Sequence, residues 1–209
     1  MQDLTRELWD KQNQHPGDRL RLFEAVSRAI DVAAALYPGS YVDIAASFVF
    51  PSVTYVDSDA RTARFFSDST GVDEIIAEHV SVAEERTWKF IGADYTTDLG
   101  LSDAQFDLLI SLYAGFVSEP CTRYLRPGAW LLVNPSHGDA ALAAIDPRSR
   151  LGGVVQSRSG TYSVSDRNLD AYLIPRRDIE VSADLIHDSG RGVAYTKSPF
   201  AYLFQLASD

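Results

Sequence analysis

The segment at positions 134–139, with the sequence NPSHGD, places an amide, a hydroxyl, an imidazole and a carboxylate close together. An imidazole has an unperturbed pKa of about 6.5, which suits proton removal at neutral pH, so His137 is a candidate general base. Asp139 could orient that imidazole as the second catalytic residue. In the alternative interpretation, Ser136 or Asp139 caps a helix over 140–145 and His137 makes structural hydrogen bonds. Both interpretations stay open from the sequence.

Acidic residues follow two other apolar runs. Asp57 comes directly after the β-branched run 53–56, and Asp94 comes after the run 89–93. A carboxylate can accept hydrogen bonds from both vicinal hydroxyls of a ribose, which makes Asp57 a candidate ligand-binding residue with Asp59 as its substitute. The alternative is that these carboxylates are solvated strand ends, with Asp59 capping the next helix.

The order of apolar runs along the chain predicts an α/β fold. Runs typical of buried strands alternate with segments of helical periodicity. This alternation predicts a doubly wound, mostly parallel sheet flanked by helices. An antiparallel strand is expected near the C-terminus. The predicted strands are 32–37, 53–56, 89–93, 107–112, 130–134, 153–155, 161–164 and 201–206, and the predicted helices are 17–35, 43–49, 60–66, 72–85, 122–125 and 140–145.

The length of 209 residues predicts one domain over 1–209. Within it we expect an N-terminal helical segment at 1–35, a ligand-binding core at 36–145 and C-terminal strands at 146–209. Ligands of open parallel sheets bind outside the carboxyl ends of the strands, so chemistry is expected just past each predicted strand.

The composition limits the classes of molecule that the protein is expected to bind. A formal net charge of −10 would repel a phosphate backbone, so we expect a small-molecule substrate and no nucleic acid. The lone cysteine, Cys121, cannot form an internal disulfide, and the sequence has neither a signal peptide nor an apolar run of membrane-spanning length. These features predict a cytoplasmic protein without a membrane span. No pair of residues has metal-ligand spacing, so no metal is expected, and a homodimer is left open.

Five short segments occur in order along the chain: LYPGSYVD at 36–43, VTYVD at 53–57, GAD at 92–94, FDLLIS at 106–111 and LRPGAWL at 125–131. In their order and spacing, residues 22–145 resemble the class I S-adenosylmethionine-dependent methyltransferases. The resemblance implies S-adenosylmethionine as cofactor, with Asp57 on its ribose and Asp94 beside its adenine. It also implies that Tyr37, Gly39 and Ser40 lie along the amino-acid end of the cofactor.

The first of these pieces departs from the family pattern. Tyr37 replaces the family's acidic residue, and only Gly39 remains of its glycines, with Tyr41 and Asp43 standing where further glycines are expected. Glycines there allow a close approach of backbone to ligand, so side chains at these positions could narrow or close the site. The sequence supports a nicotinamide dinucleotide site even less, because it has only one of the glycines that a G-x-G-x-x-G turn needs.

The leading functional hypothesis is S-adenosylmethionine-dependent methyl transfer to an oxygen or nitrogen of a small molecule, with Tyr113 and Asn134 near the acceptor and His137 as its base. Two alternatives keep the fold: a non-catalytic binding or regulatory protein, and an enzyme that uses S-adenosylmethionine without transferring methyl. A hydrolase built on Ser136, His137 and Asp139 is the weakest, because residues adjacent in sequence rarely face one another as nucleophile, base and orienting group.

Overall fold

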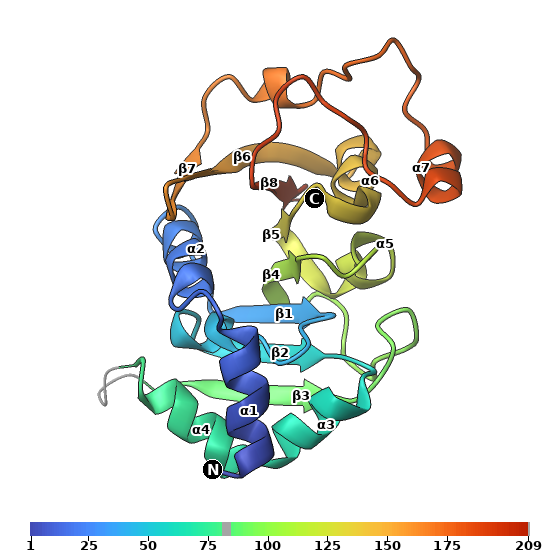
Figure 1. Cartoon of the computed structure of the whole chain (residues 1–209). Helices are drawn as coiled ribbons and strands as arrows, with labels where there is room; N and C mark the ends of the chain where they lie inside the picture. The colour runs from blue at the N-terminus through green and yellow to red at the C-terminus, as the bar shows by residue number, and fades with distance from the viewer. Residues whose placement is uncertain (81–84, 209) are drawn as a thin grey trace.

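The computed structural model describes residues 1–80 and 85–208. Its centre is an eight-stranded sheet in the order β3-β2-β1-β4-β5-β8-β6-β7 (Figure 1). The predicted α/β fold class is confirmed. The strands are β1 (Ala34–Pro38), β2 (Ser52–Val56), β3 (Thr87–Ile91), β4 (Phe106–Ser111), β5 (Leu125–Val133), β6 (Ser149–Arg158), β7 (Thr161–Ser165) and β8 (Ala201–Leu206).

The sheet has a parallel part and an antiparallel part. Strands β1 to β5 pair only in parallel with one another. Strand β8 runs antiparallel to both β5 and β6, and β7 pairs antiparallel with β6. The expected antiparallel strand near the C-terminus is therefore confirmed, and the hairpin β6–β7 extends the sheet beyond it.

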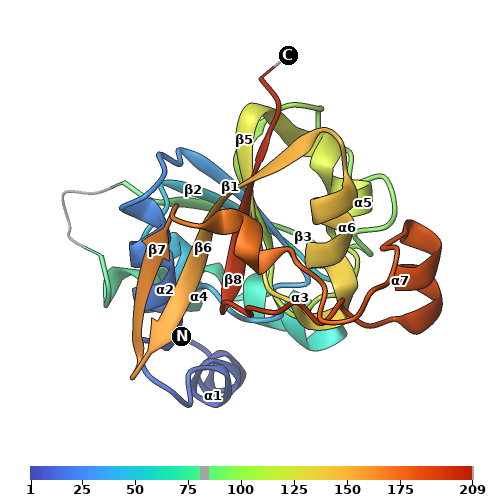
Figure 2. The same cartoon turned by 90° about the horizontal axis from the view of Figure 1, so that it is seen from above.

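Helices cover both faces of the sheet. Figures 1 and 2 show α2 on one side and α5 and α6 on the other. Successive side chains of a strand point to opposite faces of the sheet, so they pack in two separate hydrophobic cores. Tyr37 of β1 packs with Phe23 of α2, whereas Leu36 packs in the core that contains α5 and α6. The helices are α1 (Asp3–Gln12), α2 (Asp18–Ser27), α3 (Ala60–Ser67), α4 (Ser69–Ala77), α5 (Ser118–Cys121), α6 (Asp139–Ile145) and α7 (Ala183–Ser189), with 3₁₀ turns at Ala45–Phe48, Thr122–Tyr124, Ser136–Gly138 and Leu169–Tyr172.

Several element boundaries differ from the sequence prediction. The helix predicted over 17–35 ends at Ser27, and Ala34 and Ala35 lie in β1, where they pair with β2. Strand β5 begins at Leu125, before the predicted strand 130–134, and Pro127 is tolerated there because it lies where the register against β4 shifts. Helix α4 ends at Ala77, and part of the predicted helix 72–85 lies outside the described residues.

Helices α1 and α7 were not predicted as separate elements. Helix α1 is joined to the rest of the fold through Asp68, which accepts hydrogen bonds from the Gln2 backbone and the Thr5 hydroxyl. Helix α7 packs against α6 and buries Ile186. Within the described residues, no helix has both the length and the apolar character needed to cross a membrane.

Candidate functional site

The strand order places a topological switch point between β1 and β4. The chain moves outward from β1 through β2 to β3, then returns to β4 on the other side of β1 and continues to β5. Ligands of doubly wound sheets bind in the crevice outside the carboxyl ends of the two strands at such a point. The segments that follow β1 and β4 are therefore the first place to look for a site.

Several residues with left-handed backbone conformations lie at the carboxyl edge of the sheet, where the central parallel strands end. Six non-glycine residues in the described part of the chain have such a φ, and three of them follow carboxyl ends of central strands: Tyr41 (49°) after β1, Tyr113 (63°) after β4 and His137 (58°) after β5. A side chain at positive φ costs of order 1–3 kcal/mol, and residues of this kind concentrate at functional sites. The strain indicates that these three loops are held in place by their surroundings.

The loop after β1 touches the loop after β4. Gly39 has a φ of 63°, and a Cβ built on it would lie 2.3 Å from the Cβ of Ala114. The carbonyl of Ala114 accepts a hydrogen bond of 2.6 Å from the Tyr95 hydroxyl, which comes from the segment after β3. Glycine is thus required at position 39 by a close approach of the protein's own backbone.

Asp57 ties the loops after β1 and β2 together. Its Oδ2 accepts a hydrogen bond of 2.8 Å from the backbone N–H of Tyr41, and its Oδ1 accepts one of 2.8 Å from the N–H of Asp59. A carboxylate has about four acceptor positions, so acceptor capacity remains on both oxygens. The carboxylate of Asp59 accepts from the Arg61 N–H at the start of α3, which confirms the predicted cap.

Asp94 lies exposed at the end of β3. Its Oδ1 accepts hydrogen bonds from the Thr96 N–H (2.9 Å) and the Thr96 hydroxyl (2.8 Å). These bonds lower the pKa of Asp94, so the group is a carboxylate at neutral pH. It closes a local turn and keeps one oxygen without a described partner.

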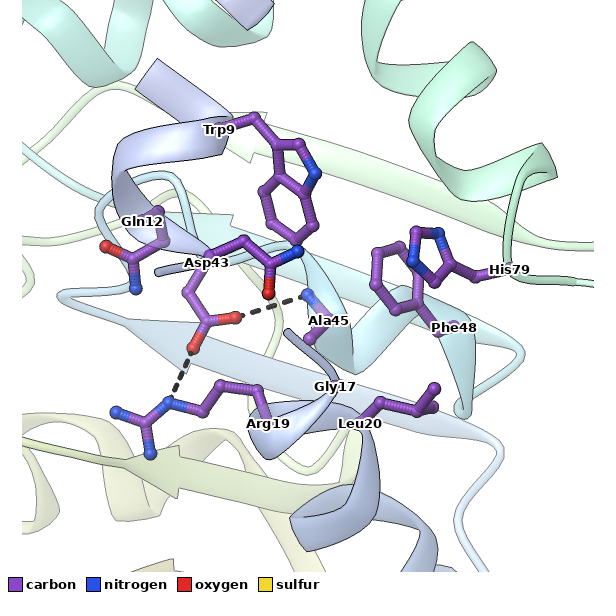
Figure 3. Close-up of a pocket in the computed structure, with 10 residues that line it drawn as sticks. Trp9, Gln12, Gly17, Arg19, Leu20, Asp43, Ala45, Phe48 and His79 are labelled. Carbon is purple, nitrogen blue, oxygen red and sulfur yellow. Dashed lines mark hydrogen bonds and ion pairs between the residues drawn. The ribbon is translucent and has the colours of Figure 1, made fainter. Parts of the chain in front are cut away.

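Tyr37 is buried at the end of β1 and packs against Phe23 of α2. Its hydroxyl donates to Oδ2 of Asp43 over 3.1 Å, and Arg19 Nε lies 3.2 Å from the same oxygen. Asp43 is 2% exposed, and its Oδ1 accepts from the Ala45 N–H, as expected for a residue capping the turn that follows (Figure 3). Burial raises the pKa of Asp43, and Arg19 opposes that effect.

Arg19 connects this buried network to the edge. Its guanidinium carbon lies 5.3 Å from the centre of the Tyr113 ring, within range of a cation–π interaction. Beside Arg19 and Asp43 is a pocket of about 20 Å³, enough for one water molecule, which Trp9 and the stacked rings of Phe48 and His79 help to line (Figure 3). The sequence analysis missed Arg19, because an arginine on the polar side of a helix carries no signal of a buried partner.

Ser40 is buried at the end of β1. Its hydroxyl donates to the carbonyl of the next residue, Tyr41, over 3.2 Å. The serine therefore supports the left-handed turn from within. Gly39, Ser40 and Tyr41 form one turn that Asp57 holds from the side.

Asn134 orders the loop after β4. Its Oδ1 accepts from the Tyr113 N–H over 3.3 Å and from the Ser136 hydroxyl over 2.6 Å. Two of the predicted acceptor residues, Tyr113 and Asn134, are thus in direct contact. Tyr113 is 53% exposed, so solvent reaches it although the Arg19 guanidinium lies near its ring.

The structure separates His137 from Asp139. Asp139 is 1% exposed, and its carboxylate accepts from the hydroxyls of Ser111 and Ser118 at 2.5 Å each, and from the Ser118 N–H at 3.0 Å. His137 is exposed, and no described contact joins it to that carboxylate. Burial raises the pKa of Asp139. Asp139 therefore joins β4, α5 and α6 rather than orienting the imidazole, and the triad of the hydrolase alternative is not assembled.

Comparisons with known proteins bear on the fold. No protein-family model and no curated protein sequence matches the chain. The structure of a methyltransferase from Geobacter sulfurreducens aligns with 100% of this chain and 91% of its own, at 11% identity and a TM-score of 0.50. The chain has the fold of class I methyltransferases. The expected fold and the resemblance stated from the sequence are confirmed at this level.

Two further structures align with this methyltransferase fold. The O-methyltransferase TomG from Streptomyces achromogenes, solved in complex with S-adenosylmethionine, aligns with 99% of this chain and 91% of its own, at 12% identity and a TM-score of 0.48. A protein from Anaeromyxobacter dehalogenans aligns over 55% of this chain and 46% of its own, at 17% identity and a TM-score of 0.39.

Proposed function

We propose that the chain binds S-adenosylmethionine at the carboxyl edge of β1, β2 and β4 and transfers its methyl group to an oxygen or nitrogen of a small molecule. The observation that carries the proposal is the left-handed backbone at Tyr41, Tyr113 and His137, in the loops after β1, β4 and β5, beside the switch point of a class I methyltransferase sheet. Rigid loops of this kind suit an enzyme that works by positioning.

The residues at the edge fit a ribose and an adenine by their chemistry. Asp57 retains acceptor capacity for ribose hydroxyls after binding two backbone N–H groups. Asp94 keeps a carboxylate oxygen for an exocyclic amino group. Gly39 and Ser40 supply the turn that would border the amino-acid end of the cofactor, and Tyr37 supports that turn from the core through Asp43. The cofactor supplies an electrophilic methyl group on a sulfonium.

The chain's own residues would handle the acceptor. Asn134 fixes the backbone of Tyr113, whose exposed ring would border the acceptor. His137 would take a proton from an acceptor hydroxyl or ammonium before or during transfer. Asp139, at the start of α6, would hold the end of β4 and the start of α5 together.

Titration calorimetry with S-adenosylmethionine tests the proposal. We expect Asp57→Asn to weaken binding by roughly 1–3 kcal/mol, because a neutral amide replaces a charged acceptor of hydrogen bonds. Asp146→Asn is the matched control, since Asp146 follows the C-terminal end of α6, away from the carboxyl edge. Equal affinity of Asp57→Asn and wild type in folded protein would remove Asp57 from the site.

One observation favours a second function, that of a non-catalytic binding protein with this fold. The contact between Gly39 and Ala114 brings the loops after β1 and β4 together at the switch point. If neither S-adenosylmethionine nor S-adenosylhomocysteine binds at millimolar concentration, this second function replaces the first. Binding without any methyl transfer would instead favour an enzyme that uses the cofactor differently.

A further inference from the structure

The segment between β7 and β8 forms a cavity of about 420 Å³ next to α7, open to solvent on one side. This volume lies in the range of small-molecule sites. Its apolar lining comes from Ile179, Leu185, Ile186 and Val193. Ile179 and Leu185 are each 42% exposed, although large apolar side chains on a protein surface are normally scattered singly. The apolar lining therefore calls for a ligand with an apolar body.

Three arginines line the same cavity: Arg176, Arg177 and Arg191. No acidic side chain is among the described residues that line it, although the whole chain has a formal net charge of −10. Within the described part of the chain, the guanidinium groups of Arg177 and Arg191 have neither an ion pair nor a hydrogen-bond partner. Free guanidinium groups beside apolar side chains match a carboxylate or a phosphate.

Backbone pairing builds the cavity from distant parts of this segment. Pro175 and Tyr195 form an antiparallel bridge, and the Arg176 N–H donates to the Ala194 carbonyl over 2.8 Å. The Arg176 Nε also donates to the Tyr195 carbonyl over 2.9 Å. The Arg191 N–H donates to the Ser189 hydroxyl, so the backbone that carries Arg191 is held too. The arginines thus extend from an ordered frame.

The cavity borders the loop that carries His137. A Cβ at Gly192 would lie 2.6 Å from the carbonyl oxygen of Pro135, and a Cβ at Gly138 would lie 2.8 Å from Ile186 Cγ2. Gly192 and Ile186 both line the cavity. The backbone on either side of His137 therefore packs directly against the wall of the cavity.

We propose that this cavity binds a small molecule with an apolar body and an anionic head, a carboxylate or a phosphate. Arg177 and Arg191 bind the head, and Leu185 and Ile179 cover the body. That the bound molecule is the methyl acceptor rests on the proposed function, since only then does the neighbouring His137 act as a base. The binding itself does not depend on the cofactor.

Titration calorimetry with three eight-carbon probes tests the inference on the full chain. The probes are sodium octanoate, octyl phosphate and octan-1-ol, which share the apolar body and differ in the head. We expect at least one anionic probe to bind ten or more times as tightly as the alcohol. The two anionic probes distinguish a carboxylate site from a phosphate site.

Variants locate the site. Arg177→Gln and Arg191→Gln should each weaken anionic binding at least fivefold, and Leu185→Asp should abolish it by placing a carboxylate in the apolar wall. All three residues are exposed, so these variants are expected to fold. Arg158→Gln is the matched control, because Arg158 is an exposed arginine at the end of β6 and outside the cavity lining.

Two results would overturn the inference: equal affinity for the alcohol and both anions, or anionic binding that Arg177→Gln and Arg191→Gln leave unchanged. Other outcomes would contradict the proposed function and leave the cavity as a binding site. Binding of an anionic probe without any binding of S-adenosylmethionine keeps the cavity as a ligand site and removes its role as acceptor site. Binding of S-adenosylmethionine without binding of any probe overturns only the cavity.

Discussion

The two halves of the carboxyl edge are built differently. After β1 and β2, polar groups satisfy one another: Asp57 binds backbone N–H groups, Asp43 binds Arg19, and Gly39 packs on Ala114. After β5, the loop that carries an exposed His137 instead borders a cavity of about 420 Å³. The first half is a hydrogen-bonded frame that keeps acceptor capacity on Asp57, and the second leaves unpaired donors and space for an anionic ligand.

This difference separates two tasks that one edge must perform. A frame that holds loops at unfavourable φ must be stabilised by buried contacts, as Asp43 and Asp57 show. A site that binds an anion must leave donors unpaired, as Arg177 and Arg191 do within the described residues. Three substitutions test whether the halves divide in this way.

The largest effect is expected for Arg19→Met, which keeps an aliphatic stem and removes the charge beside Asp43. Breaking a buried ion pair by removing one partner costs roughly 3–5 kcal/mol. Burial already raises the pKa of Asp43 above its ordinary value, and loss of Arg19 should raise it further. Between the ordinary and the raised pKa the folded variant binds a proton that the unfolded chain has lost, so its stability relative to wild type should recover as the pH falls through that interval.

Urea unfolding of this variant at pH 8 and pH 5 measures the effect. Arg21→Met is the matched control, because Arg21 is on the same helix and its carboxylate partner, Asp18, is 34% exposed. An exposed ion pair contributes at most about 1 kcal/mol. Equal losses in the two variants, or a loss for Arg19→Met that grows toward pH 5, would contradict a buried pair at this end of the sheet.

The next effect is expected for Asp139→Ala, in the second half of the edge. The substitution leaves the Ser118 N–H and the hydroxyls of Ser111 and Ser118 without their acceptor, which should cost roughly 2–3 kcal/mol of the free energy of unfolding. Asp94→Ala is the comparison, since that carboxylate is exposed and bonds only within its own turn. If Asp94→Ala lowers the free energy of unfolding as much as Asp139→Ala does, the bonds that Asp139 makes to β4 and α5 do not contribute the expected stability.

The smallest effect is the loss of stability that the clash with Ala114 causes in Gly39→Ala. Gly39 and Gly100 have nearly the same φ, 63° and 64°, but nothing lies within 4 Å of a Cβ at Gly100, whereas Ala114 would clash with one at Gly39. We expect Gly39→Ala to cost about 1–3 kcal/mol more than Gly100→Ala, measured by thermal unfolding. The double variant Gly39→Ala, Ala114→Gly should recover most of that excess, and no recovery would mean that the two loops do not touch.

The sequence predicted the fold well where the signal is local. The β-branched run at 53–56 and the apolar run at 107–112 appear as β2 and β4, because a buried parallel strand needs a continuous apolar segment. Asp59 caps α3 as its type and position predicted. The alanines at 33–35 fell in both the predicted helix 17–35 and the predicted strand 32–37, because only pairing with β2 decides where the helix gives way to β1.

The site was predicted less well, because partners across the fold decide what a polar residue does. Asp139 and His137 are close in sequence, yet the carboxylate lies with Ser111 and Ser118, 28 and 21 residues away. Arg19 and Asp43 meet only after α2 packs beside the segment that follows β1. The arginines of the cavity lie 14 residues apart, at 177 and 191, in a segment without regular periodicity.

The central claim is that a cofactor binds where the loops after β1 and β4 meet. Titrating S-adenosylhomocysteine into ¹⁵N-labelled protein while recording amide spectra tests it by position. The account predicts saturable shifts at the amides of Gly39, Tyr41 and Tyr113 with half-saturation at micromolar ligand. Unchanged spectra at millimolar ligand, or shifts confined to residues elsewhere in the chain, would contradict it.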